Sequence, residues 1–248
     1  MPASPARPNI QWSRRALAVA LASVLAFPAA GRAQDPAPAH AADANALVLD
    51  LAVSGQNTYG SSPSYIVWNG AASAARAVCA TFVTLLLQHS YGWTSSDFKA
   101  WTGSTSPNAA RYHDTIEAQN GFDRVTTIAD VRAGDILAIE YTDGSGSSGH
   151  VAVIVDAPKA RAASAPVVAG LDQFEVMVVD ASASYHGWDD TRVKADGTWS
   201  TGVGRGVMRL YADASGTITG YTWSTKTGSD YYDLQSGRHL VIGRLGGR

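Results

Sequence analysis

The chain has 248 residues, of which 46% are hydrophobic and 16% are charged, a composition typical of a globular protein with an apolar core. Its formal net charge is −2 at pH 7 and its Lys and Arg residues do not cluster, so we expect no nucleic-acid partner. Cys79 is the only cysteine, which excludes a disulfide within the chain.

The first residues of the chain have the pattern of an export signal. Ser13-Arg14-Arg15 precedes an apolar run over 16–30, and Gly31-Arg32-Ala33 places small residues where a signal peptidase reads them. We therefore predict a signal peptide over 1–33 and a periplasmic or secreted protein. The double arginine matches part of a twin-arginine signal, so the export route stays open. Because the apolar run is shorter than the roughly 20 residues that cross a bilayer, we expect no retained membrane span.

The segment 34–45 is rich in Pro, Ala and Asp and has no hydrophobic periodicity. This composition predicts a disordered linker and gives His40 no role. The remaining residues, 46–248, have the size of one domain. We predict a single domain there, with a β extension at its C-terminal end, and we expect a monomer.

Helical patterns fill the chain between 46 and 121. The strongest lies around 77–88, where apolar residues share one side and Gly92 follows the end. The alanines at 71–75 can extend this helix backwards, so its first residue stays open. The other predicted helices are 46–53, 97–101 capped by Ser95 or Ser96, and 108–119 capped by Ser106 with Pro107 at its first position.

From Arg132 onward the hydrophobic period changes to that of strands. The segment 157–170 is rich in Pro and Ala and is predicted as a loop. The order of helices first and strands afterwards predicts an α+β fold with an antiparallel sheet rather than a doubly wound fold. The predicted strands are 136–141, 150–155, 174–180, 206–211, 218–223 and 240–242.

Three polar residues in this framework have the chemistry of a cysteine nucleophile and its base. If strands 150–155 and 174–180 pair antiparallel, Asp180 lies beside His150. A carboxylate there accepts a hydrogen bond from one imidazole nitrogen and turns the other toward a thiol. Cys79, near a helix start, would have its thiolate favoured by the helix dipole and by an imidazolium. We therefore predict Cys79 as nucleophile, His150 as base and Asp180 as the group that orients the base.

Each of these residues also has a plainer explanation when it is taken alone. Free cysteines are usually small buried hydrophobic residues. Taken alone, His150 is explained as a surface residue after a glycine-rich loop. Asp180 is likewise explained as an aspartate at a strand end. The chain order of the three, and the single strand pairing that unites them, favour the catalytic interpretation.

Three short motifs of the chain have the same order and spacing as motifs of a known family. They are Cys79–Val83 for the nucleophile helix, Arg132–Leu137 for a turn and strand, and Gly149–Val155 for the strand of the base. On these residues the chain, over 65–182, resembles the NlpC-type, papain-like cysteine peptidases and amidases of bacterial cell walls, a superfamily that includes the CHAP amidases. The family's nucleophile motif has Asp before the cysteine and Ser-Gly after it, and its third polar residue is often His. The departures at Val78, Ala80-Thr81 and Asp180 indicate a divergent branch.

The resemblance implies a papain-like fold, with N-terminal helices packed on a central antiparallel sheet. It implies hydrolysis of a peptide or amide bond, in peptidoglycan, through a thioester on Cys79, without a cofactor or metal. The backbone N–H of Cys79 and the side chain of Tyr65 are the implied oxyanion donors. His186 is a candidate for the rim of the cleft or for an alternative third residue, while a metal site on His186 and the nearby aspartates is less favoured than a polar turn.

Two other functions fit the same motifs: a non-catalytic wall-binding or interaction domain with a decayed site, and an acyltransferase that uses the same Cys–His pair. On the helix 108–119, the pair His113-Asp114 is predicted to lie on a solvated face. Five tryptophans can line a sugar–peptide cleft, although packing is the commoner role; they are Trp93, Trp101, Trp188, Trp199 and Trp223.

Overall fold

A computed structural model describes Met1 and residues 37–246 of the chain. The secondary structure belongs to the compact unit Asp35–Arg248. Apart from Met1, the predicted signal peptide 1–33 lies outside the described residues, as do residues 34–36 of the predicted linker.

The helices are α1 (Ala39–Ser54), α2 (Cys79–Tyr91), α3 (Ser95–Thr102) and α4 (Ala109–Glu117), with short 3-10 turns at Gly70–Ala72 and Ile128–Asp130. The strands are β1 (Asn57–Tyr59), β2 (Tyr65–Val67), β3 (Ala74–Ala77), β4 (Phe122–Val125), β5 (Ile136–Tyr141), β6 (Gly149–Ile154), β7 (Lys159–Arg161), β8 (Asp172–Ser182), β9 (Gly202–Ala212), β10 (Ile218–Thr222), β11 (Tyr231–Asp233) and β12 (Arg238–Leu245).

The strands form a nine-stranded sheet and a small three-stranded one. The large sheet has the order β11-β10-β9-β8-β6-β5-β12-β4, with β7 beside β8, and its neighbours pair antiparallel. Its two ends approach each other, because Thr127 after β4 forms an antiparallel bridge with Thr217 before β10. In the small sheet β3 lies in the middle, parallel to β1 and antiparallel to β2.

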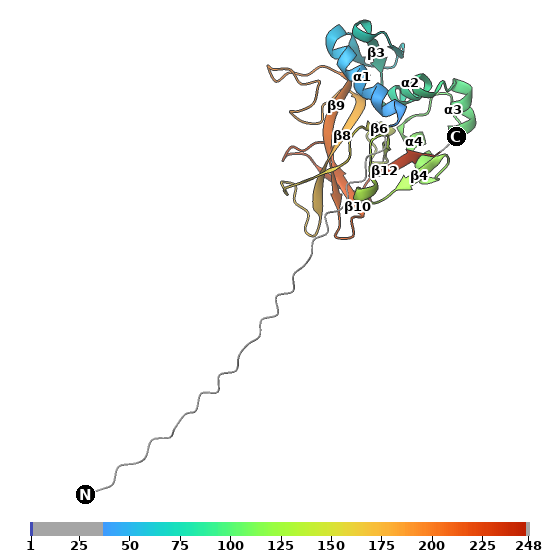
Figure 1. Cartoon of the computed structure of the whole chain (residues 1–248). Coiled ribbons are helices and arrows are strands. Elements are labelled where there is room, and N and C mark those ends of the chain that lie inside the picture. Colours follow the sequence, from blue (N-terminus) through green and yellow to red (C-terminus); the bar gives the residue numbers. More distant parts are fainter. Residues whose placement is uncertain (2–36, 247–248) are drawn as a thin grey trace. The chain divides into compact units, whose positions relative to one another are not determined.

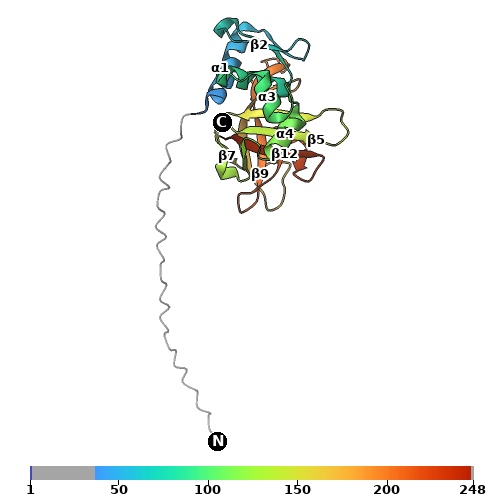
Figure 2. The same ribbon diagram turned by 90° about the vertical axis from the view of Figure 1, so that its right-hand side faces the viewer.

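The curled sheet has a core on each of its faces. Figures 1 and 2 show the helices gathered on one side of the large sheet. On that side Phe82, Val83 and Leu86 of α2 are fully buried, in one cluster with Val151 and Val153 of β6. The second core fills the inside of the curl. It is built by the residues that alternate with these along the strands, such as Ala152 and Ile154. The fold is therefore α+β, as predicted from the order of the elements.

The predicted linker is partly wrong, because α1 begins at Ala39. A stripe of small and apolar residues along α1 is buried, including Ala41, Ala44 and Leu47. His40 is 1% exposed, and its Nε2 donates to the carbonyl oxygen of Gly134 at 2.7 Å. Because alanine is only weakly hydrophobic, the alanines at the start of α1 gave no clear amphipathic pattern in the sequence.

Helix starts differ from the prediction at three places. The alanines before α2 do not extend it, because residues 74–77 form strand β3. Thr94, not Ser95 or Ser96, caps α3, in a reciprocal capping box with Asp97. Asn108, not Ser106, caps α4, and its side chain accepts from the backbone N–H of Arg111.

All six predicted strands are present, each within a few residues of its predicted ends. The strands that the pattern missed are short, namely β1, β2, β3, β4, β7 and β11, and β7 lies inside the predicted loop 157–170. Segments of three or four residues carry too little alternation to be recognised. Among the described residues, no helix is long and apolar enough to cross a bilayer.

Candidate active site

Cys79 is the first residue of α2. The chain leaves β3 at Ala77, and Val78 is extended, with φ −89° and ψ 167°, so the thiol stands at the turn from strand to helix. Its side chain is buried (7% exposed), and Sγ lies 4.0 Å from the carbonyl oxygen of Gly149. A helix N-terminus presents unpaired backbone N–H groups and a partial positive charge, which favour a thiolate there.

His150 lies at the start of β6, and the residue before it has to be glycine. Gly149 has φ +129°, and a β-carbon there would lie 1.9 Å from the carbonyl oxygen of Ile139 on β5. Such an overlap excludes any side chain, so the close approach of β5 and β6 depends on Gly149. That approach fixes where β6 begins and hence where the imidazole of His150 stands.

The antiparallel pairing predicted for the strands of His150 and Asp180 is present. Val153 of β6 pairs with Val179 of β8, which places His150 and Asp180 diagonally on the same face of the sheet. His150 Nε2 lies 2.6 Å from Asp180 Oδ2. Since a carboxylate only accepts, this nitrogen is the donor, and Nδ1 is left for the hydrogen bond with the thiol of Cys79.

Asp180 binds two further cationic groups besides His150. His186 Nε2 lies 2.9 Å from the same Oδ2, and Arg192 Nη1 lies 2.9 Å from Oδ1. The other nitrogen of His186, Nδ1, lies 2.7 Å from the carbonyl oxygen of Trp223. Both ring nitrogens of His186 therefore face acceptors. His186 is fully buried, which contradicts a place on the rim of a cleft.

Arg192 is held in turn by Asp190. Its Nε and Nη2 donate to the two carboxylate oxygens of Asp190 at 2.9 and 2.7 Å, and Asp190 Oδ2 also accepts from the backbone N–H of His186 at 2.8 Å. All three side chains are buried. A charge taken out of water is tolerated only when it is paired and hydrogen-bonded, and this network satisfies that condition.

Two glycines of β9 leave the space that this network occupies. A β-carbon at Gly204 would lie 2.6 Å from Nε of Arg192, and one at Gly206 would lie 2.4 Å from Oδ2 of Asp190. Gly204 stands opposite Asp180 in the β8–β9 pairing. The glycines at alternate positions of β9 thus bring the backbone against the buried charged groups.

The electrostatics of the site favour a thiolate–imidazolium pair. Burial acts to raise the pKa of the Cys79 thiol, but the charge of His150 and its hydrogen bond outweigh this and lower that pKa below its ordinary value. Burial acts to lower the pKa of His150, whereas the charge of Cys79 and the hydrogen bond to Asp180 raise it to about 10. Burial would raise the pKa of Asp180, yet Arg192 and the two histidines hold it well below its ordinary value.

Trp223 borders the two histidines. Its ring centroid lies 4.7 Å from that of His150 in an edge-on arrangement and 4.1 Å from that of His186. The indole Nε1 donates to the carbonyl oxygen of Tyr185 at 3.1 Å. Trp223 therefore fixes both rings sterically and shields the bonds to Asp180 from water, which strengthens them.

Burial and the charge of Cys79 raise the pKa of Tyr59 and of Tyr141, whereas the predicted Tyr65 shows no such link to the thiol among the described contacts. Tyr65 on β2 is 41% exposed. Tyr59 on β1 is half-buried and pairs with Ala77, two residues before Cys79. Burial first, and then the negative charges of Cys79 and Asp180, raise the pKa of Tyr59 to about 12. A phenol that stays protonated next to a reacting thiolate is a hydrogen-bond donor.

Among the described residues, three groups of side chains have the donor atoms of a metal site, and two of the three share His113. The ligand atoms of His150, Asp180 and His186 lie within 4.8 Å of one another. Both imidazoles, however, donate hydrogen to Asp180, and a ring nitrogen that carries hydrogen cannot ligate a metal. In this arrangement both histidines act as hydrogen-bond donors to Asp180.

The second group lies on the helix side of the sheet and consists of His113, Glu117 and His239. His113 Nε2 and His239 Nδ1 are 2.8 Å apart, a hydrogen bond between two imidazoles. His113 is 4% exposed, so its predicted place on a solvated face is wrong. Glu117 is paired with Arg124, so this carboxylate already has a cation as partner.

The sequence analysis gave no role to Tyr59 or Arg192, and it considered Asp190 only for a metal site and Trp223 only for a cleft wall. Tyr59 lies on β1, Asp190 and Arg192 precede β9, and Trp223 follows β10. The glycine alternation at 202, 204 and 206 is the signal that was available, since glycines at every second position of a strand indicate that something large lies against one face.

The fold and the site together define an α+β protein with a buried Cys–His–Asp line next to a helix N-terminus. No family model matches the chain. No solved structure matches it. An uncharacterized protein of Acanthamoeba polyphaga mimivirus is 35% identical over 175 residues, which cover 67% of this chain and 76% of that protein. The chain belongs to the same family as this viral protein.

Proposed function

We propose that the protein is an exported cysteine hydrolase that cleaves a peptide or amide bond in peptidoglycan through a thioester on Cys79, as a divergent branch of the NlpC- and CHAP-type enzymes with their papain-like fold. One observation carries the proposal. His150 stands between a thiol and a carboxylate: its Nε2 donates to Asp180 Oδ2 at 2.6 Å, and, against the effect of burial, the charge of Cys79 and its hydrogen bonding with the imidazole raise the pKa of His150. This is the hydrogen-bonding line that a thiol nucleophile and its base need.

In the first half of the reaction the thiolate of Cys79 attacks the carbonyl carbon of the substrate and forms a C–S bond. The carbonyl π electrons move to oxygen and give a tetrahedral oxyanion. When the oxyanion collapses, the C–N bond breaks and the imidazolium of His150 protonates the leaving nitrogen. The products are a free amine and a thioester on Cys79. Because the thiolate and imidazolium exist before substrate arrives, no separate deprotonation of the thiol is required.

In the second half neutral His150 removes a proton from water, and the hydroxyl oxygen attacks the thioester carbon. The C–S bond breaks, a carboxylic acid leaves, and Cys79 returns as thiolate beside the imidazolium. Asp180 remains ionised throughout, since Arg192 and His186 keep its charge compensated. Asp180 thus holds the ring of His150 in one orientation and stabilises its charged form.

We propose two donors for the oxyanion. The backbone N–H of Cys79 is in the first turn of α2, where backbone N–H groups have no partner within the helix. The hydroxyl of Tyr59 is the second, because Tyr59 is half-buried and pairs with Ala77, two residues before Cys79. Pre-oriented donors of this kind stabilise a developing negative charge without reorganisation.

The substrate class rests on the predicted signal peptide and on the resemblance of the three motifs to cell-wall enzymes. An exported hydrolase meets the wall peptides at its place of action. The proposal requires no cofactor and no metal, because the thiolate, the base and the oxyanion donors all belong to the chain.

Purified sacculi test the proposal. The mature protein is expected to release soluble muropeptides, whose masses identify the bond that is cut, and Cys79→Ala is expected to release none while keeping its circular dichroism spectrum and thermal midpoint. Activity in Cys79→Ala equal to that of the natural protein would exclude Cys79 as nucleophile. If the natural protein releases nothing, the domain is a binding module. If fragments appear only as adducts of an added amine, the enzyme is an acyltransferase.

A further inference from the structure

We propose that an aromatic platform next to the candidate active site binds a glycan, through the pyranose rings of amino sugars. The platform consists of Tyr185, Trp188 and Trp199, together with Lys226 and the hollow beside it. In peptidoglycan such a glycan is the strand from which the peptides branch. The identification of this glycan as the peptidoglycan strand rests on the proposed function, whereas the binding of the sugar is tested without catalysis.

Trp188 and Trp199 are exposed in a way that packing does not explain. Their exposed fractions are 64% and 48%, whereas the other described tryptophans are half-buried or buried. Tyr185 lies between them, with its ring centroid 5.8 Å from that of Trp188 and 4.9 Å from that of Trp199. Flat aromatic rings that stay in water and gather in one place indicate a recognition surface.

Lys226 binds the platform together. Its Nζ lies 4.0 Å from the ring centroid of Tyr185 and 4.1 Å from that of Trp188, and it donates to the hydroxyl of Tyr185 at 2.7 Å. A cation against two ring faces fixes both rings in place. The rings are therefore held before any ligand binds, which lowers the entropic cost of binding.

A hollow of about 520 Å³ adjoins the platform at Trp188, and this volume lies in the range of small-molecule sites. Its other lining residues are polar or small: Asp189, Thr225, Lys226, Thr227, Gly228 and Ser229. An aromatic wall beside hydroxyl, carboxylate and ammonium groups matches a pyranose, which has an apolar C–H face and a rim of hydroxyl and acetamide groups.

A buried arginine holds the loop that carries Lys226 through hydrogen bonds. Arg209 is fully buried, and its Nη2 donates to the carbonyl oxygens of Thr225 and Lys226 at 2.6 and 3.2 Å. Across the base of the loop, the hydroxyls of Ser224 and Ser229 lie 2.6 Å apart. The hollow is thus a built feature of the fold rather than a gap beside a loose loop.

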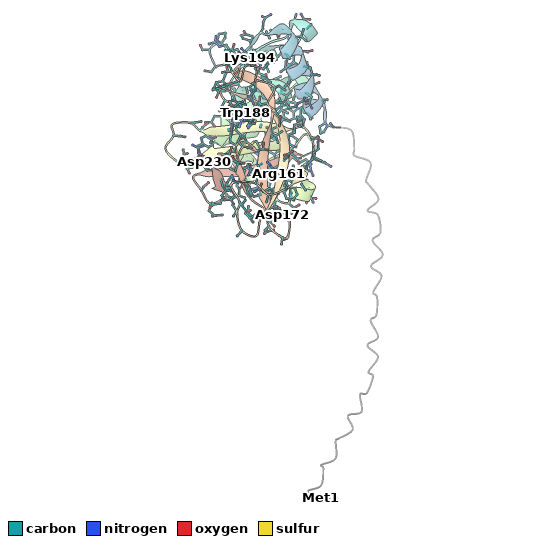
Figure 3. The ribbon with its side chains drawn as sticks, turned by 90° about the vertical axis from the view of Figure 1, so that its left-hand side faces the viewer. Met1, Arg161, Asp172, Trp188, Lys194 and Asp230 are labelled. Atoms are coloured by element: carbon teal, nitrogen blue, oxygen red, sulfur yellow. The ribbon has the colours of Figure 1, made fainter. Side chains whose placement is uncertain are left out.

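The platform is continuous with the candidate active site. Tyr185 precedes His186, and its carbonyl oxygen accepts from the indole of Trp223, whose ring contacts His150. Figure 3 shows Trp188 on the face turned to the viewer, the same face as Asp230 at the end of the 224–229 loop. The platform is therefore joined to His150 by one intervening ring, that of Trp223.

Other flat ligands fit the platform less well. A nucleic-acid base also stacks on tryptophan, but its phosphates require a basic surface, and the hollow is lined by one lysine and one aspartate, Lys226 and Asp189, in a chain of net charge −2. An apolar peptide requires a pocket lined by apolar side chains, whereas this hollow has hydroxyl groups on its walls. The amino sugar is the ligand class that uses both parts of the surface.

Binding is measured on the full mature chain with Cys79→Ala, so that hydrolysis cannot contribute. The probe is the β-1,4-linked tetramer of N-acetylglucosamine, titrated by calorimetry, with a free peptide of wall composition as the comparison ligand. We expect saturable binding of the tetramer that becomes about tenfold or more weaker in Trp188→Ala and in Trp199→Ala. Both rings are exposed, so these variants should fold, and their thermal midpoints check this.

Val53→Ala is the matched control, because Val53 is exposed on α1 and belongs to neither site; it should bind the tetramer like the parent. Tetramer binding that is absent, or that the two tryptophan variants leave unchanged, overturns the glycan subsite. So does a tryptophan-dependent affinity for the peptide alone. These results leave the hydrolase proposal untouched, since that proposal fails only on the release of fragments from sacculi.

Discussion

His186 donates a hydrogen bond to Oδ2 of Asp180, the oxygen that His150 also uses, and the two contacts measure 2.9 and 2.6 Å. The carboxylate that orients the candidate base is thus itself oriented, on one side by a second imidazole and on the other by Arg192 at 2.9 Å. Buried charges arranged in this way are costly to rearrange, so the geometry of the base is fixed before substrate binds.

The reactivity of Cys79 toward iodoacetamide should extend to mildly acidic pH. The pKa of Cys79 is lowered chiefly by the charge of His150 against the effect of burial, so the thiolate persists below the pKa of an ordinary thiol. In His150→Ala the two effects of the imidazole are lost while burial and the charge of Asp180 still raise the pKa of Cys79, so the pH profile should move to the alkaline side. His89→Ala, an exposed histidine on the same helix, is the control and should leave the profile unchanged. An identical profile in His150→Ala would contradict the ion pair.

Hydrolysis should have an alkaline limit near the pKa of His150. That pKa is raised to about 10 by the charge of Cys79 and the bond to Asp180, against the effect of burial. Its contribution to folding is therefore complete below the unfolded value of about 6.5 and is lost as pH rises through about 10. The initial rate and the free energy of unfolding, measured between pH 7 and 11, should decline over the same interval. A rate that keeps rising above pH 10 would contradict the assignment of the alkaline limit to His150.

Asp180→Asn should impair both activity and stability. The amide cannot hold the imidazolium, and kcat should fall by about 10²- to 10⁴-fold. The change also removes the buried carboxylate that faces His186 and one of the two carboxylates that pair with Arg192, which should cost about 3–5 kcal/mol. Urea denaturation measures the loss in the free energy of unfolding. The rate is compared at temperatures where the variant is folded. A stable variant with full activity would show that the carboxylate does not orient the base.

Gly149→Ala should be far more destabilising than Gly144→Ala, although both glycines have positive φ and lie in the same loop region. A β-carbon at Gly149 overlaps the carbonyl oxygen of Ile139 at 1.9 Å, whereas nothing lies within 4 Å of one at Gly144. We expect a loss of about 1 kcal/mol for Gly144→Ala from the backbone conformation alone, and roughly 3 kcal/mol or more for Gly149→Ala. Equal midpoints in urea would mean that β5 and β6 are not held together as closely as the structure has them.

Acidification should weaken the attachment of α1. Burial lowers the pKa of His40, and its neutral ring donates to Gly134 and accepts from Tyr91. Its contribution is therefore complete above the unfolded pKa of about 6.5 and is lost as pH falls through the lower folded value. The free energy of unfolding should drop between pH 7 and 5, and the drop should be smaller in His40→Gln. An equal drop in both proteins would assign it to other groups.

The part of the site that sequence reasoning predicted is the part that rests on a regular pattern. Two apolar alternating runs separated by a loop predict an antiparallel pair, and the ends of that pair bring His150 and Asp180 together. Cys79 was placed by the amphipathic run that follows it, although only the structure shows that residues 74–77 are a strand and that the helix begins at the thiol.

The rest depends on contacts between segments with no periodic pattern. Tyr59 reaches Cys79 through a parallel pairing of two short strands, which is set by packing rather than by local sequence. Arg192 and Asp190 come from an irregular segment that folds back over the glycines of β9. The alternating glycines of β9 indicate a buried charged network only once this segment is known to pack against them. A polar turn was therefore the natural interpretation of the sequence around His186.

Intact-mass analysis of the acid-quenched reaction tests the central claim most directly. During turnover of a soluble wall peptide, the protein should gain the mass of the acyl part of the substrate, on the proteolytic fragment that contains Cys79, and hydroxylamine should remove it as expected for a thioester. Cys79→Ala should show neither the added mass nor product. Product formation by Cys79→Ala at the natural rate, or an acyl group found on another residue, would contradict the account.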